Sequence, residues 1–231
     1  MSAEHAVVTV QGWREAGKYL QQSLHDSVSE HVLSDSLLGI KRYASATQQQ
    51  QQHLDPRLSL LLVKTAAESA TYLPSLILKL LSAKGPPDKS LACCRIITTC
   101  RALDASAAVM QLVSACPDAA AHRQSVVQQL LRADVRRMVG TTQQQLAALL
   151  ADSPELLPPR LLAISLLNWA GQLADTAVEE TDSAALSELL GGALQVAAAL
   201  QRSLTDSSAG DFREAFLATS QFTSTCCGFV R

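Results

Sequence analysis

Residues 55–88 read DPRLSLLLVKTAAESATYLPSLILKLLSAKGPPD, and the order of residue types in this stretch decides the fold class. Asp55 followed by Pro56 predicts the start of a helix, because Asp caps the free amides of a first turn and Pro fits the position after the cap. Pro74 predicts the start of a second helix, since inside a helix it would remove a hydrogen bond. Residues 84–87, a Lys, a Gly and two Pro, predict where that helix ends.

Similar signals predict helices along the rest of the chain. Two helices are expected upstream of this stretch, over residues 11–32 and 35–47, and a long helix is expected to begin at Pro158-Pro159. A last short helix is expected over residues 212–219. Together these signals predict about ten helices. The residues expected to cap helices from residue 88 onward are Asp88, Asp104, Asp118, Thr142 and Ser153.

The composition is that of a folded helical protein. Apolar residues make up 48% of the chain and charged residues 17%, which is too apolar and too weakly charged for a disordered protein. Aromatic residues, which strands favour, are only 4%. The fold class is therefore predicted to be all-α. The formal net charge of −2 provides no cationic field, so no nucleic acid partner is expected.

Helix pairs recur at similar spacings in the middle of the chain. Residues 59–86 and 90–117 superpose at a spacing of 31 residues, and residues 117–154 span a further 37. Three consecutive helix pairs of this length resemble armadillo- and HEAT-type helical repeats, which implies a solenoid over residues 55–154. The alternative is a multi-helix bundle similar in composition to those of vinculin and talin, which the two long helices after residue 159 favour.

Composition also divides the chain into three parts. N-terminal helices and a polar run of Gln occupy residues 1–53, where residues 48–52 are expected to be a frayed helix end or a linker. Residues 54–206 are expected to form the main helical array. Residues 207–231 are expected to hold a short helix and a Ser- and Gly-rich tail.

Neither secretion nor a membrane span is expected. The first residues have neither the basic start nor the apolar run of a secretory signal. The two most apolar windows, residues 58–81 and 156–178, are interrupted by Pro and by charged residues before they reach the length of a span, about 18 residues. Two adjacent cysteine pairs are poor material for a disulfide framework, which favours a reducing, cytoplasmic location.

No residue pattern predicts catalysis or a cofactor. The five histidines are scattered, and the six cysteines form no CxxC pair, so no metal site is expected. Helical spacing places Cys93, Cys94 and Cys100 near an apolar face with Leu91 and Ile97, so they are expected to be packing residues rather than nucleophiles. We therefore expect a protein that is not an enzyme and that holds no cofactor.

The residues expected to bind a partner are four arginines and one tryptophan. The arginines lie within fifteen residues and can pair with carboxylates or phosphates, although a solvated helix face is the alternative. The tryptophan is large enough to anchor an interface. These residues are Arg123, Arg132, Arg136, Arg137 and Trp13.

Because neither catalysis nor a cofactor nor nucleic acid binding is expected, binding to other proteins is the predicted function. We expect an interaction or scaffold subunit of a larger intracellular assembly, with other proteins as partners and a homo-oligomer as one form of it. The alternative is a helical protein that binds a small molecule or lipid in an apolar pocket formed by residues 60–81 and 161–173.

Overall fold

The computed structural model describes residues 3–25, 28–51, 55–82, 89–153, 157–177 and 183–205. Within these ranges the chain forms nine α-helices, two short 3₁₀-helices and no strand, which confirms the predicted all-α class. The predicted helix over residues 212–219 and the predicted cap Asp88 lie outside the described residues. The α-helices are α1 (Ala3–His25), α2 (Glu30–Gln51), α3 (Pro56–Ser69), α4 (Leu73–Ser82), α5 (Lys89–Ser114), α6 (Ala120–Leu130), α7 (Ala133–Asp152), α8 (Leu157–Thr176) and α9 (Ser183–Thr205).

The helix starts that involve proline are confirmed. α3 begins at Pro56, and the carboxylate of Asp55 accepts a hydrogen bond from the backbone amide of Arg57 at 2.9 Å. Pro74 is the second residue of α4, where its missing amide costs no helical hydrogen bond. α8 begins at Leu157, immediately before the two prolines.

The predicted cap at Asp104 is wrong, because α5 is continuous across this position. Neither Pro nor Gly occurs within α5, so the backbone carries nothing that stops the helix. The Asp104 carboxylate instead pairs with the Nζ of Lys41 on α2 at 2.7 Å. The side chain that was predicted to cap a helix therefore forms an ion pair with another helix.

The predicted caps at Thr142 and Asp118 are also wrong. Thr142 lies in the middle of α7, where its hydroxyl bonds a carbonyl one turn back at 2.9 Å. Ser153 ends α7, where its amide donates to the carbonyl of Leu149 at 2.9 Å, and the helix start predicted to follow it at Pro154 lies outside the described residues. α6 follows Ala119 without a side-chain capping bond, so Asp118 does not cap it.

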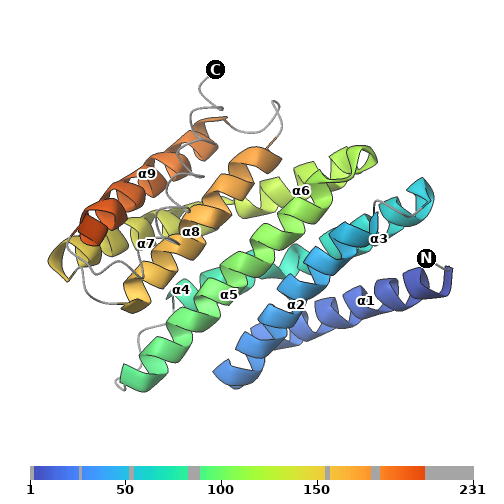
Figure 1. Ribbon diagram of the computed structural model, residues 1–231, viewed down its shortest axis with the longest axis horizontal. Helices are drawn as coiled ribbons and strands as arrows, with labels where there is room; N and C mark the ends of the chain where they lie inside the picture. The colour runs from blue at the N-terminus through green and yellow to red at the C-terminus, as the bar shows by residue number, and fades with distance from the viewer. Residues whose placement is uncertain are drawn as a thin grey trace.

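Apart from α6, the α-helices of the described residues lie in two rows (Figure 1). α2, α5 and α8 pack side by side in one row, and α1, α3 with α4, α7 and α9 follow one another in the second. A nearly constant sequence separation of bonded residues shows that the helices of the first row run in the same direction. Four pairs join neighbours in this row at separations of 62 to 65 residues: Glu30–Arg95, Lys41–Asp104, Ser106–Trp169 and Ser114–Thr176.

The repeat solenoid and the count of about ten helices are not confirmed. The first predicted unit contains α3, a 3₁₀-turn and α4, whereas the second consists mainly of the unbroken α5. The two units therefore do not share a helix–break–helix structure at a spacing of 31 residues. A helical bundle is consistent with the packing, and the described residues hold nine α-helices.

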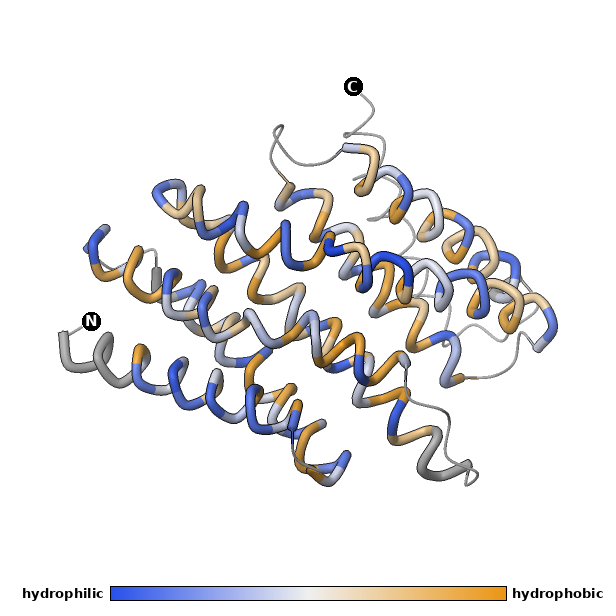
Figure 2. Tube along the Cα trace, turned by 180° about the vertical axis from the view of Figure 1, so that it is seen from behind, coloured by the Kyte–Doolittle hydropathy of each residue, from blue (hydrophilic) through white to orange (hydrophobic). Residues whose placement is uncertain are grey.

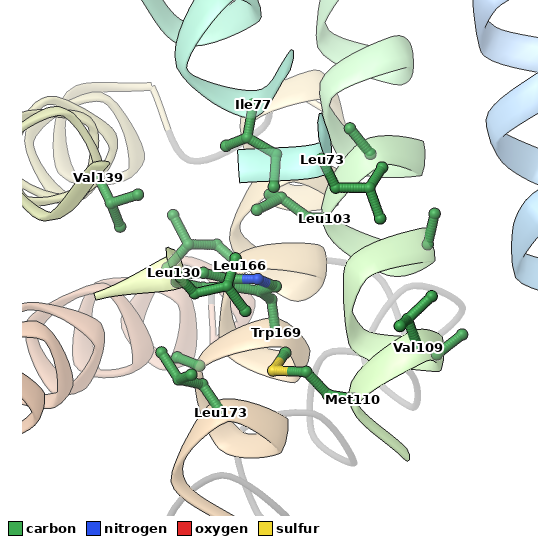
Figure 3. Packing of buried hydrophobic residues seen from close by; sticks show 14 of the residues in the cluster. Leu73, Ile77, Leu103, Val109, Met110, Leu130, Val139, Leu166, Trp169 and Leu173 are labelled. Atoms are coloured by element: carbon green, nitrogen blue, oxygen red, sulfur yellow. The ribbon is translucent and has the colours of Figure 1, made fainter. Parts of the chain in front are cut away.

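The core forms where the two rows meet (Figure 3). Ile77, Leu103, Leu166 and Trp169 converge there from α4, α5 and α8. Trp169 is fully buried, and its Nε1 donates to the Oγ of Ser106 at 3.2 Å. Apolar and polar residues alternate along most helices, as helices with one buried face require (Figure 2). The division of the chain at residues 53 and 206 stays a prediction.

Two helices contain segments with the length and apolar composition of a membrane span. These segments are Cys93–Ser114 of α5 and Ser183–Ser203 of α9, and 72% and 50% of their apolar windows are buried inside the fold. Core helices of globular proteins pass the same test, so composition does not distinguish the two cases. The expected lack of a membrane span stays a prediction.

Candidate functional site

α1 and α2 form an antiparallel hairpin at one end of the array (Figure 1). The two helices meet at Tyr43, whose hydroxyl donates to the carbonyl of Thr9 at 2.8 Å and whose ring centroid lies 5.2 Å from that of Trp13. Gly12 permits this approach, because a Cβ at that position would lie 2.6 Å from the Tyr43 hydroxyl. Otherwise α1 packs mainly on α3, and α2 packs mainly on α5.

Because α1 and α2 pack on different helices, they leave a groove between them, with a volume of about 750 Å³. Small residues line it on both sides, with Gly12 and Ala16 on α1 and Ser36 and Gly39 on α2. A Cβ built at Gly39 meets no atom within 4 Å, so this part of the groove is open. The lining residues are Gln11, Gly12, Glu15, Ala16, Tyr19, Ser36, Gly39, Ile40 and Tyr43.

The groove is mostly apolar, and Glu15 is the only charged residue among those that line it. The Glu15 carboxylate accepts a hydrogen bond from the Gln11 amide at 3.2 Å. Burial raises the pKa of Tyr43, and the nearby Glu15 charge raises it further, against the opposite effect of the Thr9 hydrogen bond. Tyr43 therefore stays a neutral phenol, and the rim carries one negative charge.

Two polar atoms of aromatic residues in this hairpin are buried without a hydrogen-bond partner in the described part of the chain. They are the hydroxyl of Tyr19, whose side chain lines the groove, and the Nε1 of Trp13. A buried donor without a partner costs about 1–3 kcal/mol. Trp13 and Tyr19 of the hairpin therefore lack the side-chain hydrogen bond that Trp169 makes in the core.

The structure places Trp13 in the core rather than on a surface that a partner can reach. Its side chain is 1% exposed, although its neighbours on α1 contribute to the groove. The burial of Trp13 has a simple cause, because a large apolar side chain on the inward face of an amphipathic helix gains more from burial than from exposure. Trp13 contributes to the site only through its contact with Tyr43.

The structure brings three of the predicted arginines to the start of α7, where two of them are already paired. Arg132 binds Asp134, with 2.6 Å between Nη2 and Oδ2, and this bond holds the pKa of that carboxyl below its usual value. Arg136 binds Glu188 of α9 at 3.0 Å. Arg137 is exposed, and Arg123 is half-buried on α6. Their role in partner binding stays a prediction.

The expected burial of the cysteine face of α5 is wrong in part. Cys93 is exposed and Ile97 is 42% exposed, whereas Cys94 and Cys100 are half-buried. The buried face of this part of α5 is instead formed by Thr98 and Thr99, because α5 is covered on two sides by α2 and α8. In the part of the chain that the structure describes, no group of His, Cys, Asp and Glu is arranged to hold a metal ion.

The apolar segments that were expected to form a ligand pocket both contribute to the buried core. Leu73, Leu76 and Ile77 belong to the same buried cluster as Leu166 and Leu173. The residues that line the α1–α2 groove belong to no sequence motif. The signal that could have found it is the helical spacing of small residues, at 12 and 16 on α1 and at 36 and 39 on α2.

No family model matches this chain, and no curated protein matches it. Among solved structures, the chain is similar to one described as "Computational Design of Self-Assembling Cyclic Protein Homooligomers". The match has 12% sequence identity and a TM-score of 0.34, and it covers 99% of this chain and 95% of the other. A match at that TM-score does not show a shared fold.

Proposed function

We propose that this protein is a non-catalytic interaction subunit of an intracellular assembly, and that the α1–α2 groove is its contact surface. The single observation that carries the proposal is the open groove of about 750 Å³ between two helices that both contribute small lining residues. Its partner is an amphipathic helix of another protein, with a narrow apolar face.

The lining supports a helix as the occupant. Residues that line the groove recur at helical spacing on both sides, so the groove runs along the two helix axes. Small residues let a third helix approach closely, and an amphipathic helix binds such a groove through apolar residues three and four positions apart. Val32, 53% exposed, lies one turn before Ser36 on α2 and extends the apolar surface in the same direction.

The negative charge of Glu15 indicates which charge the partner helix should carry. Glu15 is the only charged lining residue, so a Lys or Arg beside the apolar face of the partner helix finds a complementary charge there. The free thiols of Cys93, Cys94, Cys100 and Cys116 support the proposal that the protein works in a reducing, cytoplasmic compartment.

The parallel row of α2, α5 and α8 supports a second, structural part of the proposal. Helices at a near-constant sequence offset are typical of stacked helical units such as armadillo and HEAT repeats. We propose that the array is an irregular member of this architectural class, with the α1–α2 hairpin as its terminal unit.

An apolar small molecule is the alternative occupant, and the volume of the groove is compatible with it. Ligand sites in proteins range from about 300 to 1,000 Å³, and the groove falls within that range. A native mass spectrum of the purified protein separates the two cases. A retained mass that is lost when the groove is filled would favour the small molecule.

The test fills the groove without disturbing the fold. Gly39→Trp places an indole where a Cβ meets no atom within 4 Å, and Gly191→Trp on α9 is a matched control, since its Cβ position is equally open. Each variant and the parent chain are immobilised, and proteins bound from native extract are quantified by mass spectrometry. Partners captured by the parent chain and by Gly191→Trp should be lost at least about tenfold with Gly39→Trp, equivalent to 1.4 kcal/mol.

Two outcomes would overturn the proposal. The first is a strictly monomeric protein that captures no stoichiometric companion. The second is a set of partners that binds the parent chain and both variants equally well. Far-UV circular dichroism and thermal unfolding of both variants establish that each remains folded.

A further inference from the structure

We propose that Cys94 is a modification site, a thiol that exchanges with small disulfides with His31 as its base. Cys94 lies half-buried on α5, and its Sγ is 4.0 Å from the Nε2 of His31 on α2. The two residues are 63 positions apart, so only the parallel packing of α2 on α5 brings them together. Neither residue lines the α1–α2 groove, so this site is separate from the proposed contact surface.

The pair supplies the two groups that thiol exchange needs. The thiolate, not the thiol, is the nucleophile, and an adjacent imidazole that takes the proton activates it. His31 is exposed, so its ring can pass the proton on to solvent or to a leaving group. Cys94 is partly exposed as well, so a small disulfide can reach its sulfur.

The other described cysteines lack this combination. Burial raises the pKa of Cys100 to about 11, which keeps it protonated. Cys116 is buried, with 7% of its surface exposed. Cys93 is the most accessible, but within the described residues it has no histidine partner. Accessibility alone therefore favours Cys93, whereas activation by a base favours Cys94.

The charged groups next to the pair form an ion pair with each other. Arg95 binds the Glu30 carboxylate at 2.7 Å and 2.8 Å, and the residues flank Cys94 and His31 in sequence. Both side chains are about one-quarter exposed. The ion pair carries no net charge, and the His31 imidazole is the group that contacts the thiol.

The reaction is balanced without a further oxidant. The Cys94 sulfur attacks one sulfur of a small disulfide, a new S–S bond forms, and the S–S bond of the small disulfide breaks. The thiol proton moves to His31 Nε2 and then to the departing thiolate, which leaves as a free thiol. The products are a mixed disulfide on Cys94 and one small thiol.

The experiment compares two adjacent cysteines in the full chain. Oxidised glutathione is the probe, and the rate of mixed-disulfide formation at each cysteine is measured by mass spectrometry with peptide fragmentation. Cys94 is followed in Cys93→Ser and Cys93 in Cys94→Ser, and each is repeated with His31→Gln. Because residues 93 and 94 share one peptide, these variants assign the modification without ambiguity.

We expect Cys94 to react faster than the more exposed Cys93. His31→Gln should slow Cys94 by about tenfold, less than the full effect of a positioned general base, and leave Cys93 unchanged. A Cys94 that reacts no faster than Cys93 would overturn the proposal, as would a Cys94 rate that His31→Gln leaves the same. An equal fall at both cysteines would also overturn it, because that result reports a general change in structure.

Discussion

Gln143 on α7 and Gly192 on α9 lie in direct contact, with no room for a side chain at position 192. A Cβ on Gly192 would overlap the carboxamide oxygen of Gln143 and lie 2.9 Å from its Cδ. Gln143 is 1% exposed, and its Nε2 donates to the carbonyl of Leu189 at 3.1 Å. The glycine thus keeps a buried polar side chain in bonding position between the two helices.

Gly192→Ala should destabilise the protein by about 1–3 kcal/mol, because the new methyl group displaces Gln143 from its buried hydrogen bond. Gly191→Ala is the matched control, since position 191 is exposed and a Cβ there meets no atom within 4 Å. The control should gain about 0.5–1 kcal/mol, the ordinary benefit of Ala over Gly in a helix. Urea unfolding of both variants measures the difference.

A double-mutant cycle isolates the contact. In a Gln143→Ala background the same Gly192→Ala change should cost little, because the group that it displaces is gone. Equal free energies of unfolding for Gly191→Ala and Gly192→Ala would contradict the close contact.

The two tryptophans should respond differently to replacement by Phe. Trp169→Phe leaves the Ser106 hydroxyl without its donor, whereas Trp13→Phe removes an Nε1 that has no partner in the described part of the chain. Both side chains are at most 1% exposed, so the packing losses are similar. Trp169→Phe should cost on the order of 1 kcal/mol more. Each variant retains one tryptophan, whose fluorescence reports unfolding in denaturant; an equal cost would argue against the Ser106 bond.

The ion pair between Asp104 and Lys41 should contribute more than a surface pair does. Asp104→Asn removes a partner of a 2.7 Å contact in which the Asp side chain is 24% exposed, and it should cost about 1 kcal/mol. Glu68→Gln is the control, because its 3.9 Å pair with Lys64 is more than half exposed and should contribute less than about 0.5 kcal/mol. Chemical unfolding at low and high salt tests this, since a similar small effect for both changes would contradict the difference.

Cys100 should make stability fall at alkaline pH. Burial raises the pKa of its thiol from 9.0 to about 11, so the unfolded chain releases this proton at lower pH than the folded chain. The contribution is complete below about pH 9 and is lost as pH rises toward 11, with a slope of at most about 1.4 kcal/mol per pH unit. Cys100→Ala should unfold with a shallower dependence on pH across this window. Parallel curves for the two proteins would contradict the raised pKa.

Local sequence signals predicted the parts of the fold that depend on the backbone. Asp55, Pro56 and Pro74 marked helix starts correctly, because a capping carboxylate and a missing amide act within one turn. Asp104 and Thr142 failed for the opposite reason. Their side chains can cap a helix, but each stands inside a continuous one, and for Asp104 the deciding partner, Lys41, comes from a distant helix.

The two candidate sites could not be predicted from neighbouring residues in the sequence. The α1–α2 groove arises where two helices diverge, and their divergence depends on what each packs against on its other side. The contact between Cys94 and His31 likewise exists only through the parallel packing of α5 on α2. Neither feature has a sequence motif, because the residues that form it lie on separate helices.

The sequence by itself determined that the chain is all-helical and where the proline-marked helices begin, because helix propensity, capping and proline geometry act over a few residues. Tertiary structure alone decided which side chains are buried, paired or left open, as Trp13 and Ile97 illustrate in opposite directions. The physical reason is that burial and pairing depend on neighbours brought together across the fold, whereas the start of a helix depends on the residues beside it.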